Sequence, residues 1–127
     1  MQGALHGKSI LLVEDNADIQ AFVSTVARLE GAELVVAPTG EDGLEALKKQ
    51  ESLDLVLLDL NLPGIQGWDI LVDMNSRKEF QQLPVVVFSA FTDAPTRERA
   101  AAMGAVGFIA KPVGARELVD QLKVFLS

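Results

Sequence analysis

Five short runs of consecutive apolar residues, separated by stretches of mixed polarity, constrain the fold of this chain more than any other feature. The runs are residues 10–13, 34–37, 55–58, 85–88 and 108–110. Continuous apolar runs, as opposed to alternating ones, are typical of strands that are buried on both faces of a sheet. We therefore predict five strands at these positions.

The stretches between the runs have helical character. Ile19, Phe22 and Val26 recur at the spacing of one helix face, and Gly31 follows as a stop signal. The other helices are expected from Thr39 onward, over residues 68–75, from Pro95 to residues 100–102 before Gly104, and around Leu118, Leu122, Phe125 and Leu126. Strands that alternate with helices indicate a parallel sheet. The predicted fold class is α/β, a five-stranded parallel sheet with helices on both faces.

The composition excludes several classes of function. The 127 residues suffice for one domain with its own core. The chain has no cysteine, which excludes disulfide scaffolds, thiolate metal sites and cysteine nucleophiles. It carries 18 Asp and Glu against 11 Lys and Arg, a net charge of −7. Because an acidic surface repels phosphate backbones, we expect no direct binding of nucleic acid.

Domain bounds and location also follow from the sequence as expectations. The longest uncharged run, residues 80–92, is too short to span a bilayer, so we expect no membrane partner. Residues 1–7 lack the apolar core of a signal peptide. We expect them to be a flexible lead-in or a remnant of expression, and residues 8–127 to form the domain. The absence of cysteine fits a cytoplasmic location.

Polar side chains follow four of the five apolar runs directly. Glu14 and Asp15 follow the first run, Asp59 the third, Ser89 the fourth and Lys111 the fifth. In an open parallel sheet, binding sites lie beyond the carboxyl ends of the strands, near the point where the strand order reverses. We therefore expect three carboxylates, a hydroxyl and an ammonium group to converge at one edge of the sheet.

This set of side chains suits phosphoryl chemistry. Carboxylate oxygens are preferred ligands of Mg²⁺, which keeps several waters and favours phosphate as a further ligand. An aspartate can attack phosphorus and form an acyl phosphate. A lysine and a hydroxyl can neutralise and hydrogen-bond the phosphoryl oxygens during in-line transfer. The sequence thus indicates a Mg²⁺-assisted site for a phosphoryl group.

The segments that carry these residues resemble the receiver domains of two-component response regulators. They are LLVEDN (11–16), LVLLDLNLPGIQGWDIL (55–71), VVVFSAF (85–91) and GAVGFIAKPV (104–113). The resemblance covers nearly the whole chain. The 30 residues from Asp59 to Ser89 and the 52 from Asp59 to Lys111 are spacings usual for that family. The resemblance implies the flavodoxin-like fold of the chemotaxis-regulator type.

The resemblance also assigns the acceptor and the metal ligands. Asp59 is implied as the phosphoacceptor, which would receive its phosphoryl group from a histidine kinase or a histidine phosphotransfer protein. Glu14 and Asp15 are implied as the acidic pair that holds Mg²⁺ together with Asp59, and Asp15 is favoured as the direct ligand. Asn61 would supply its backbone carbonyl to the metal.

A second group of residues is implied as the switch. Ser89 and Lys111 would hold the phosphoryl oxygens, and Phe108 would occupy the aromatic switch position. The Lys111–Pro112 bond is implied to be cis. The surface of the fourth helix, fifth strand and fifth helix would then be read by an output domain, an effector protein or a second copy in a phosphorylation-dependent homodimer. The chain would be no enzyme beyond catalysing its own phosphorylation and dephosphorylation.

The departures from the family pattern are small. The acidic pair reads Glu-Asp where Asp-Asp is more frequent, Ser89 stands where threonine is more frequent, and Phe108 lacks the hydroxyl of a tyrosine. None of them removes an essential group. Arg97 and Arg99 are expected to lie on a solvated helix face.

Other interpretations remain open. The segment 14–16 could merely cap the first helix, and Asp59 or Lys111 alone could be an ordinary loop residue; their joint placement at four strand ends favours a site. A degenerate receiver could act as a phosphorylation-independent binding scaffold, although its usual mark, loss of the acceptor or the lysine, is missing. An aspartate-nucleophile phosphatase would need a second aspartate where this chain has Asn61.

Overall fold

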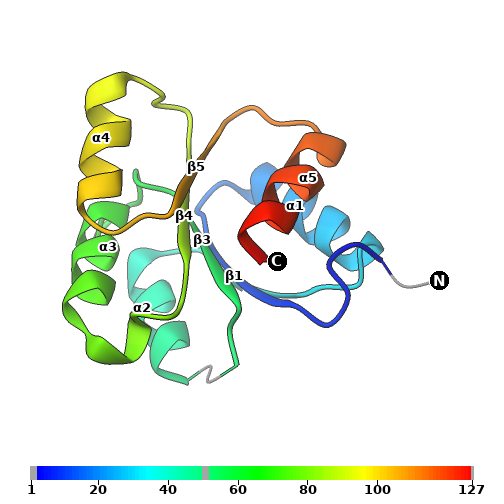
Figure 1. Ribbon diagram of the computed structural model, residues 1–127, viewed down its shortest axis with the longest axis horizontal. Coiled ribbons are helices and arrows are strands. Elements are labelled where there is room, and N and C mark those ends of the chain that lie inside the picture. Colours follow the sequence, from blue (N-terminus) through cyan, green and yellow to red (C-terminus); the bar gives the residue numbers. More distant parts are fainter. Residues whose placement is uncertain (1–2, 50–51, 127) are drawn as a thin grey trace.

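Five parallel strands form one sheet at the centre of the molecule, in the order β2-β1-β3-β4-β5 (Figure 1). The strands are β1 (Ser9–Val13), β2 (Glu33–Ala37), β3 (Leu55–Leu58), β4 (Val85–Ser89) and β5 (Gly107–Ala110). The computed structural model, which describes residues 3–49 and 52–126, thus confirms the five predicted strands to within one residue at each end. The α/β prediction and the flavodoxin-like topology are confirmed.

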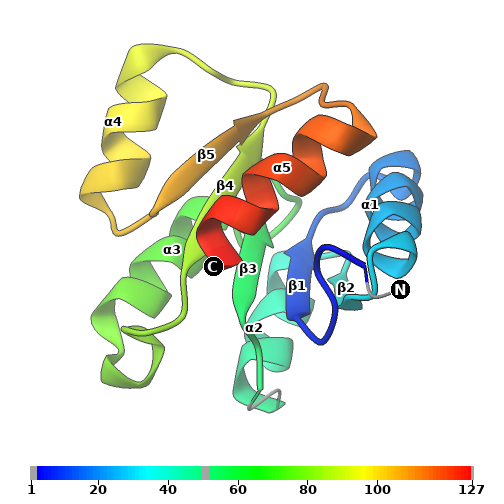
Figure 2. The ribbon, with the colours of Figure 1, turned by 45° about the vertical axis from the view of Figure 1, so that its right-hand side comes forward.

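Helices cover both faces of the sheet. α1 (Ala17–Leu29) and α5 (Ala115–Leu126) lie on one face (Figures 1 and 2). On the other face lie α2 (Gly40–Lys49), α3 (Gly67–Ser76) and α4 (Ala94–Ala102). A short 3₁₀ helix, η1 (Lys78–Phe80), precedes β4 and was not predicted. Within the part of the chain that the structure describes, no helix combines the length and apolarity needed to cross a membrane.

The three central strands are buried on both faces, as their continuous apolar runs predict. In β1, Leu11 and Val13 pack toward α2 and α3, and Ile10 and Leu12 pack toward α1 and α5. Successive side chains of a strand point to opposite faces, so one run supplies both halves of the core. The edge strands β2 and β5 are only partly covered, because each has a single neighbour in the sheet.

A capping side chain begins α1 at the functional end of the sheet. Asn16 is the N-cap of α1, and its Oδ1 accepts a hydrogen bond of 3.0 Å from the backbone N–H of Ile19. The capping interpretation of residues 14–16 therefore applies to Asn16. Glu14 and Asp15 precede the N-cap, so neither of their carboxylates caps α1.

The structure differs from the expected loose lead-in. Leu5 is only 1% exposed and packs into the core beneath α1 and α5. Its N–H donates to the Glu30 carbonyl oxygen over 3.0 Å, and the Gly7 N–H donates to the Gly31 carbonyl oxygen over 3.2 Å. The buried leucine contributes about 1.5–3 kcal/mol to folding, and the backbone hydrogen bonds of the segment add to it. Residues 1–2 of the expected lead-in lie outside the described residues.

Candidate functional site

The predicted acids meet at the carboxyl ends of two neighbouring strands. Glu14 follows β1 and Asp59 follows β3, and these strands pair in parallel at the centre of the sheet. The Asp59 N–H donates to the Val13 carbonyl oxygen over 3.0 Å, which carries the pairing of the strands to their ends. Carboxylate oxygens of Glu14, Asp15 and Asp59 all lie within 4.8 Å of one another. This convergence agrees with the positions of the acids after the apolar runs of the sequence.

Lys111 reaches the same acids from the end of β5. Its Nζ donates a short hydrogen bond to Glu14 Oε1 and lies 3.4 Å from Asp59 Oδ2. Its side chain is 13% exposed, and its Nζ lies 5.0 Å from the centre of the Phe88 ring. The bond from Lys111 to Pro112 is cis, as the resemblance implied. One ammonium group therefore contacts two of the three carboxylates.

The site carries an excess of negative charge, and two of its three acids, Glu14 and Asp59, are buried. Burial raises the pKa of Glu14, and the charge of Asp59 raises it further, while hydrogen bonds from Lys111 and from the Asn16 N–H oppose the shift. Three ionised carboxylates and one ammonium leave a net charge of −2. Oxygen donors with this charge fit a hard divalent cation such as Mg²⁺. Asp15 is exposed and so has room for water beside such an ion.

The turn after β3 is shaped around Asp59. The Asn61 N–H donates to Asp59 Oδ1 over 3.2 Å, and the Gly67 N–H donates to the Leu60 carbonyl oxygen over 3.1 Å. A Cβ on residue 67 would lie 2.0 Å from the Asp59 carbonyl oxygen, so only glycine permits this approach. Gly67 thereby lets α3 begin directly beside the acid.

Ser89 ends β4 next to the site. It is completely buried, and its hydroxyl oxygen accepts a hydrogen bond of 3.0 Å from the Phe91 N–H. The Lys111 N–H donates to the Ser89 carbonyl oxygen over 2.9 Å, which joins the two strand ends. The hydroxyl thus lies where the β4–α4 connection begins.

Comparison with known proteins identifies the family. Residues 10–123 match the family described as the response regulator receiver domain. The chain belongs to this family.

Curated relatives of this receiver domain include regulators and a sensor kinase. The transcriptional regulatory protein CpxR of Escherichia coli is 32% identical over 117 residues, 92% of this chain and 48% of the relative. The CAI-1 autoinducer sensor kinase/phosphatase CqsS of Vibrio cholerae is 30% identical over 129 residues, 99% of this chain and 18% of the relative. The polar-differentiation response regulator DivK of Brucella ovis is 26% identical, over 94% of this chain and 96% of the relative. The chain thus spans half or less of several relatives and nearly all of another.

Solved structures share the fold. The chemotaxis response regulator CheY4 of Vibrio cholerae superposes with a TM-score of 0.88 at 24% identity, covering 94% of this chain and 98% of the other. The BeF3-activated N-terminal receiver domain of Klebsiella pneumoniae RstA gives 0.85 at 27% identity, with the same coverage. This receiver domain therefore has the CheY-like fold that the sequence predicted.

Two arginines of α4 contribute contacts that the sequence analysis missed. The Arg97 guanidinium carbon lies 4.6 Å from the centre of the half-buried Phe108 ring, and that of Arg99 lies 4.1 Å from the Trp68 ring. The sequence predicts both arginines on a solvated face, and both are exposed, but each also covers an aromatic ring. No sequence pattern predicts these arginine–aromatic contacts, because the arginine and the ring come from different elements.

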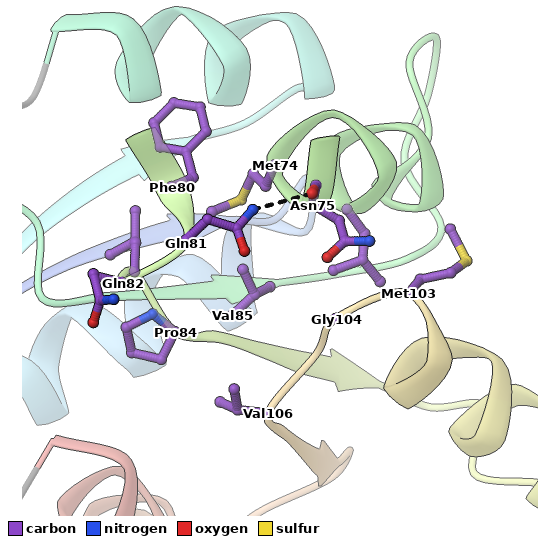
Figure 3. A pocket seen from close by; sticks show the side chains of 12 residues that line it. Met74, Asn75, Phe80, Gln81, Gln82, Pro84, Val85, Met103, Gly104 and Val106 are labelled. Atoms are coloured by element: carbon purple, nitrogen blue, oxygen red, sulfur yellow. Dashed lines mark hydrogen bonds between the residues drawn. The ribbon is translucent and has the colours of Figure 1, made fainter. Parts of the chain in front are cut away.

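Two hollows flank α4 in this receiver domain. One of about 220 Å³ lies near the acceptor turn and is lined by Leu60, Asn61, Trp68, Phe91 and Thr96. Another of about 250 Å³ lies at the opposite end of the sheet, between α3, η1 and the α4–β5 connection (Figure 3). The residues that line the second hollow include no ionisable side chain.

Proposed function

We propose that this domain is a phosphoacceptor signalling module of a two-component system, in which Asp59 takes a phosphoryl group from a histidine kinase or a histidine phosphotransfer protein. The observation that carries the proposal is the meeting of three carboxylates with Lys111 at the carboxyl ends of β1, β3 and β5. Full-length relatives named as transcriptional regulators and as a sensor kinase support the signalling context. We place the module in the cytoplasm, where ATP-dependent kinases act.

Catalysis of phosphoryl transfer depends mainly on positioning the reactants and neutralising their charge. A carboxylate oxygen of Asp59 attacks the phosphorus, the bond from phosphorus to the donor nitrogen breaks, and that nitrogen keeps the electron pair and takes up a proton. The Asn61 N–H on Oδ1 and the Lys111 ammonium near Oδ2 hold the attacking carboxylate in place. The chain would catalyse this reaction and its own dephosphorylation only.

Four residues are assigned to the metal. Carboxylates of Glu14, Asp15 and Asp59 and the backbone carbonyl of Asn61 would hold Mg²⁺, with Asp15 the favoured direct ligand because it is the exposed member of the pair. When bound, Mg²⁺ supplies the positive charge that lets an anionic phosphoryl group approach an anionic carboxylate. Lys111 provides the remaining cation at the site.

Signal output follows from Ser89 and Phe108. The Ser89 hydroxyl accepts from the Phe91 N–H and still has its own proton to donate, so a phosphoryl oxygen on Asp59 that accepts this proton would draw the hydroxyl inward and alter the start of the β4–α4 connection. Phe108, stacked against Arg97, responds to the space this opens. The changed α4-β5-α5 surface is then read by an output domain, an effector protein or a second copy of the domain.

Acetyl phosphate labelling tests the proposal. With Mg²⁺, the wild-type chain should gain one phosphoryl group by intact-mass analysis, and Asp59→Asn should gain none. Asp73→Asn, at a partly exposed acid of α3 that pairs with Arg77, is the matched control and should label like wild type. Addition of EDTA should abolish labelling. Equal labelling of Asp59→Asn would refute the acceptor assignment, and no label in wild type would favour the scaffold alternative.

A further inference from the structure

A side chain from α1 reaches back to the loop that carries the acidic pair. Gln20 Nε2 donates a hydrogen bond of 2.6 Å to the backbone carbonyl oxygen of Glu14. This carbonyl belongs to the peptide group that joins Glu14 to Asp15. Because a peptide group is planar, fixing its oxygen fixes the direction in which the chain enters Asp15.

The other hydrogen bonds of the loop act on Glu14 and Asn16. The Asn16 N–H donates to Glu14 Oε2 over 3.1 Å, and the Glu14 N–H donates to the Ala37 carbonyl oxygen over 3.0 Å. Glu14 is also buried and bonded to Lys111. Its carboxylate is therefore held by packing and by its own partners.

Asp15 lacks this kind of support from packing, because its side chain is exposed. The placement of its carboxylate depends on the backbone on either side of it. After Asp15, the backbone is held in place because Asn16 caps α1. Before Asp15, the peptide group is held by the hydrogen bond from Gln20. The two side chains together bracket the exposed acid.

We propose that Gln20 is a positioning residue for the metal site: through the Glu14 carbonyl it sets where the Asp15 carboxylate lies relative to Asp59. The inference rests on the proposed function, since it assigns Gln20 to the Mg²⁺ site of that function. An amide suits this task because it donates a hydrogen bond without changing the net charge of −2 that matches a divalent cation. Partners that orient metal ligands commonly alter affinity without touching the ion.

Mg²⁺ titration of the whole chain, followed by NMR shifts of the amides of residues 14–16 and 59–61, tests this role. Gln20→Met keeps the length of the side chain and removes the donor. We expect its Mg²⁺ dissociation constant to rise about three- to tenfold, the range for losing one partly buried hydrogen bond that orients a ligand. Acetyl phosphate labelling at saturating Mg²⁺ should return to the wild-type rate, since positioning affects affinity and not the acceptor.

Gln121→Met is the matched control. Gln121 is also a half-buried helical glutamine with a side-chain hydrogen bond, to Glu117 Oε1 over 3.1 Å, but it lies on α5. Its variant should bind Mg²⁺ like wild type. If both variants lower the melting temperature and neither shifts the Mg²⁺ midpoint, Gln20 has a structural role only and the inference is wrong.

Gln20→Glu separates geometry from charge. A carboxylate repels the Glu14 carbonyl oxygen, so loss of positioning predicts weaker Mg²⁺ binding despite the added negative charge. Tighter binding in Gln20→Glu with unchanged binding in Gln20→Met would overturn the inference in favour of plain electrostatics. Gln20→Ala replaces Gln20→Met should the latter fail to fold. A wild-type chain that binds no Mg²⁺ would refute the metal part of the proposed function instead.

Discussion

Lys111 is the residue on which the charge balance of the site depends. Its ammonium bonds Glu14 and lies near Asp59, and both carboxylates are buried. Buried charges of like sign destabilise a protein unless a partner compensates them. Lys111 therefore stabilises the free domain in addition to its proposed contact with the phosphoryl group.

Replacing Lys111 should separate these two tasks. Lys111→Met keeps the bulk of the side chain but leaves the two buried carboxylates without their cation, so we expect a loss of about 2–4 kcal/mol in the free energy of unfolding at pH 7. Mg²⁺ should restore part of it, because a bound cation replaces the missing charge. Urea denaturation without Mg²⁺ measures the loss of stability, and urea denaturation with Mg²⁺ at about 10 mM, a concentration suited to weak sites, measures its recovery. Lys123→Met, exposed on α5, should change stability by less than about 0.5 kcal/mol.

At the scale of elements, α4 is the α-helix with the fewest buried residues. Ala100 is its only buried residue. Arg97 and Arg99 add contacts with Phe108 and Trp68, and stacked contacts of this kind contribute about 0.5–1 kcal/mol each at exposed positions. A movement of Phe108 would break its contact with Arg97 and so weaken the attachment of α4. This weak attachment suits a helix that is proposed to change position when the site is phosphorylated.

The N-cap of α4 makes its stability depend on pH. Asp93 accepts hydrogen bonds from the Thr96 hydroxyl and from the Thr96 N–H, and these bonds hold the pKa of the Asp93 carboxyl below its ordinary value. A carboxyl group with a lowered folded pKa stabilises the folded state above its unfolded pKa and loses that contribution as the pH falls through the folded pKa. We expect the amide-exchange protection factors of residues 97–100 to decrease below about pH 4, the ordinary range of an aspartate.

Asp93→Asn provides the control for this pH effect. Asparagine is an equally good N-cap and does not titrate. The protection factors of the α4 amides, measured from pH 5 to pH 3 and corrected for the intrinsic exchange rate at each pH, should therefore fall more in wild type than in Asp93→Asn. Identical profiles in the two proteins would show that protonation elsewhere causes the loss of protection.

At the scale of the whole molecule, the proposed function joins the site to the α4-β5-α5 surface through one buried hydroxyl. Ser89 lies between the acidic edge and the β4–α4 connection, and its backbone is paired to Lys111. Burial of an aromatic ring stabilises a new state by about 1–3 kcal/mol, which shifts a two-state equilibrium about tenfold or more without locking it. The domain is thus expected to respond as an equilibrium between two forms.

Ser89→Ala tests this coupling. The variant should still accept a phosphoryl group on Asp59, because the acceptor, the acids and Lys111 are unchanged. It should show smaller NMR shift changes over residues 89–112 on addition of beryllofluoride. Shift changes that equal those of wild type, or that in wild type stay within the residues lining the site, would rule out this route for the signal.

Much of the fold and the acidic edge could be predicted from the sequence. Strand burial leaves continuous apolar runs, and a parallel sheet gathers the residues after those runs at one edge. Glu14, Asp15, Asp59 and Lys111 were therefore found from their positions alone. The residues that directly follow each strand could be identified without knowing how the elements pack, because the apolar run that marks a strand is a local property of the sequence.

Only the tertiary structure decided which side chains support that edge. Gln20 bonds the Glu14 carbonyl, Arg97 covers Phe108, and Leu5 enters the core, and in each pair the geometry depends on how one element lies against another. The sequence determined which residues stand at the ends of the strands, since that follows from local hydrophobic patterning. Contacts between elements depend on the distances and directions that packing sets, which patterning along the chain does not encode.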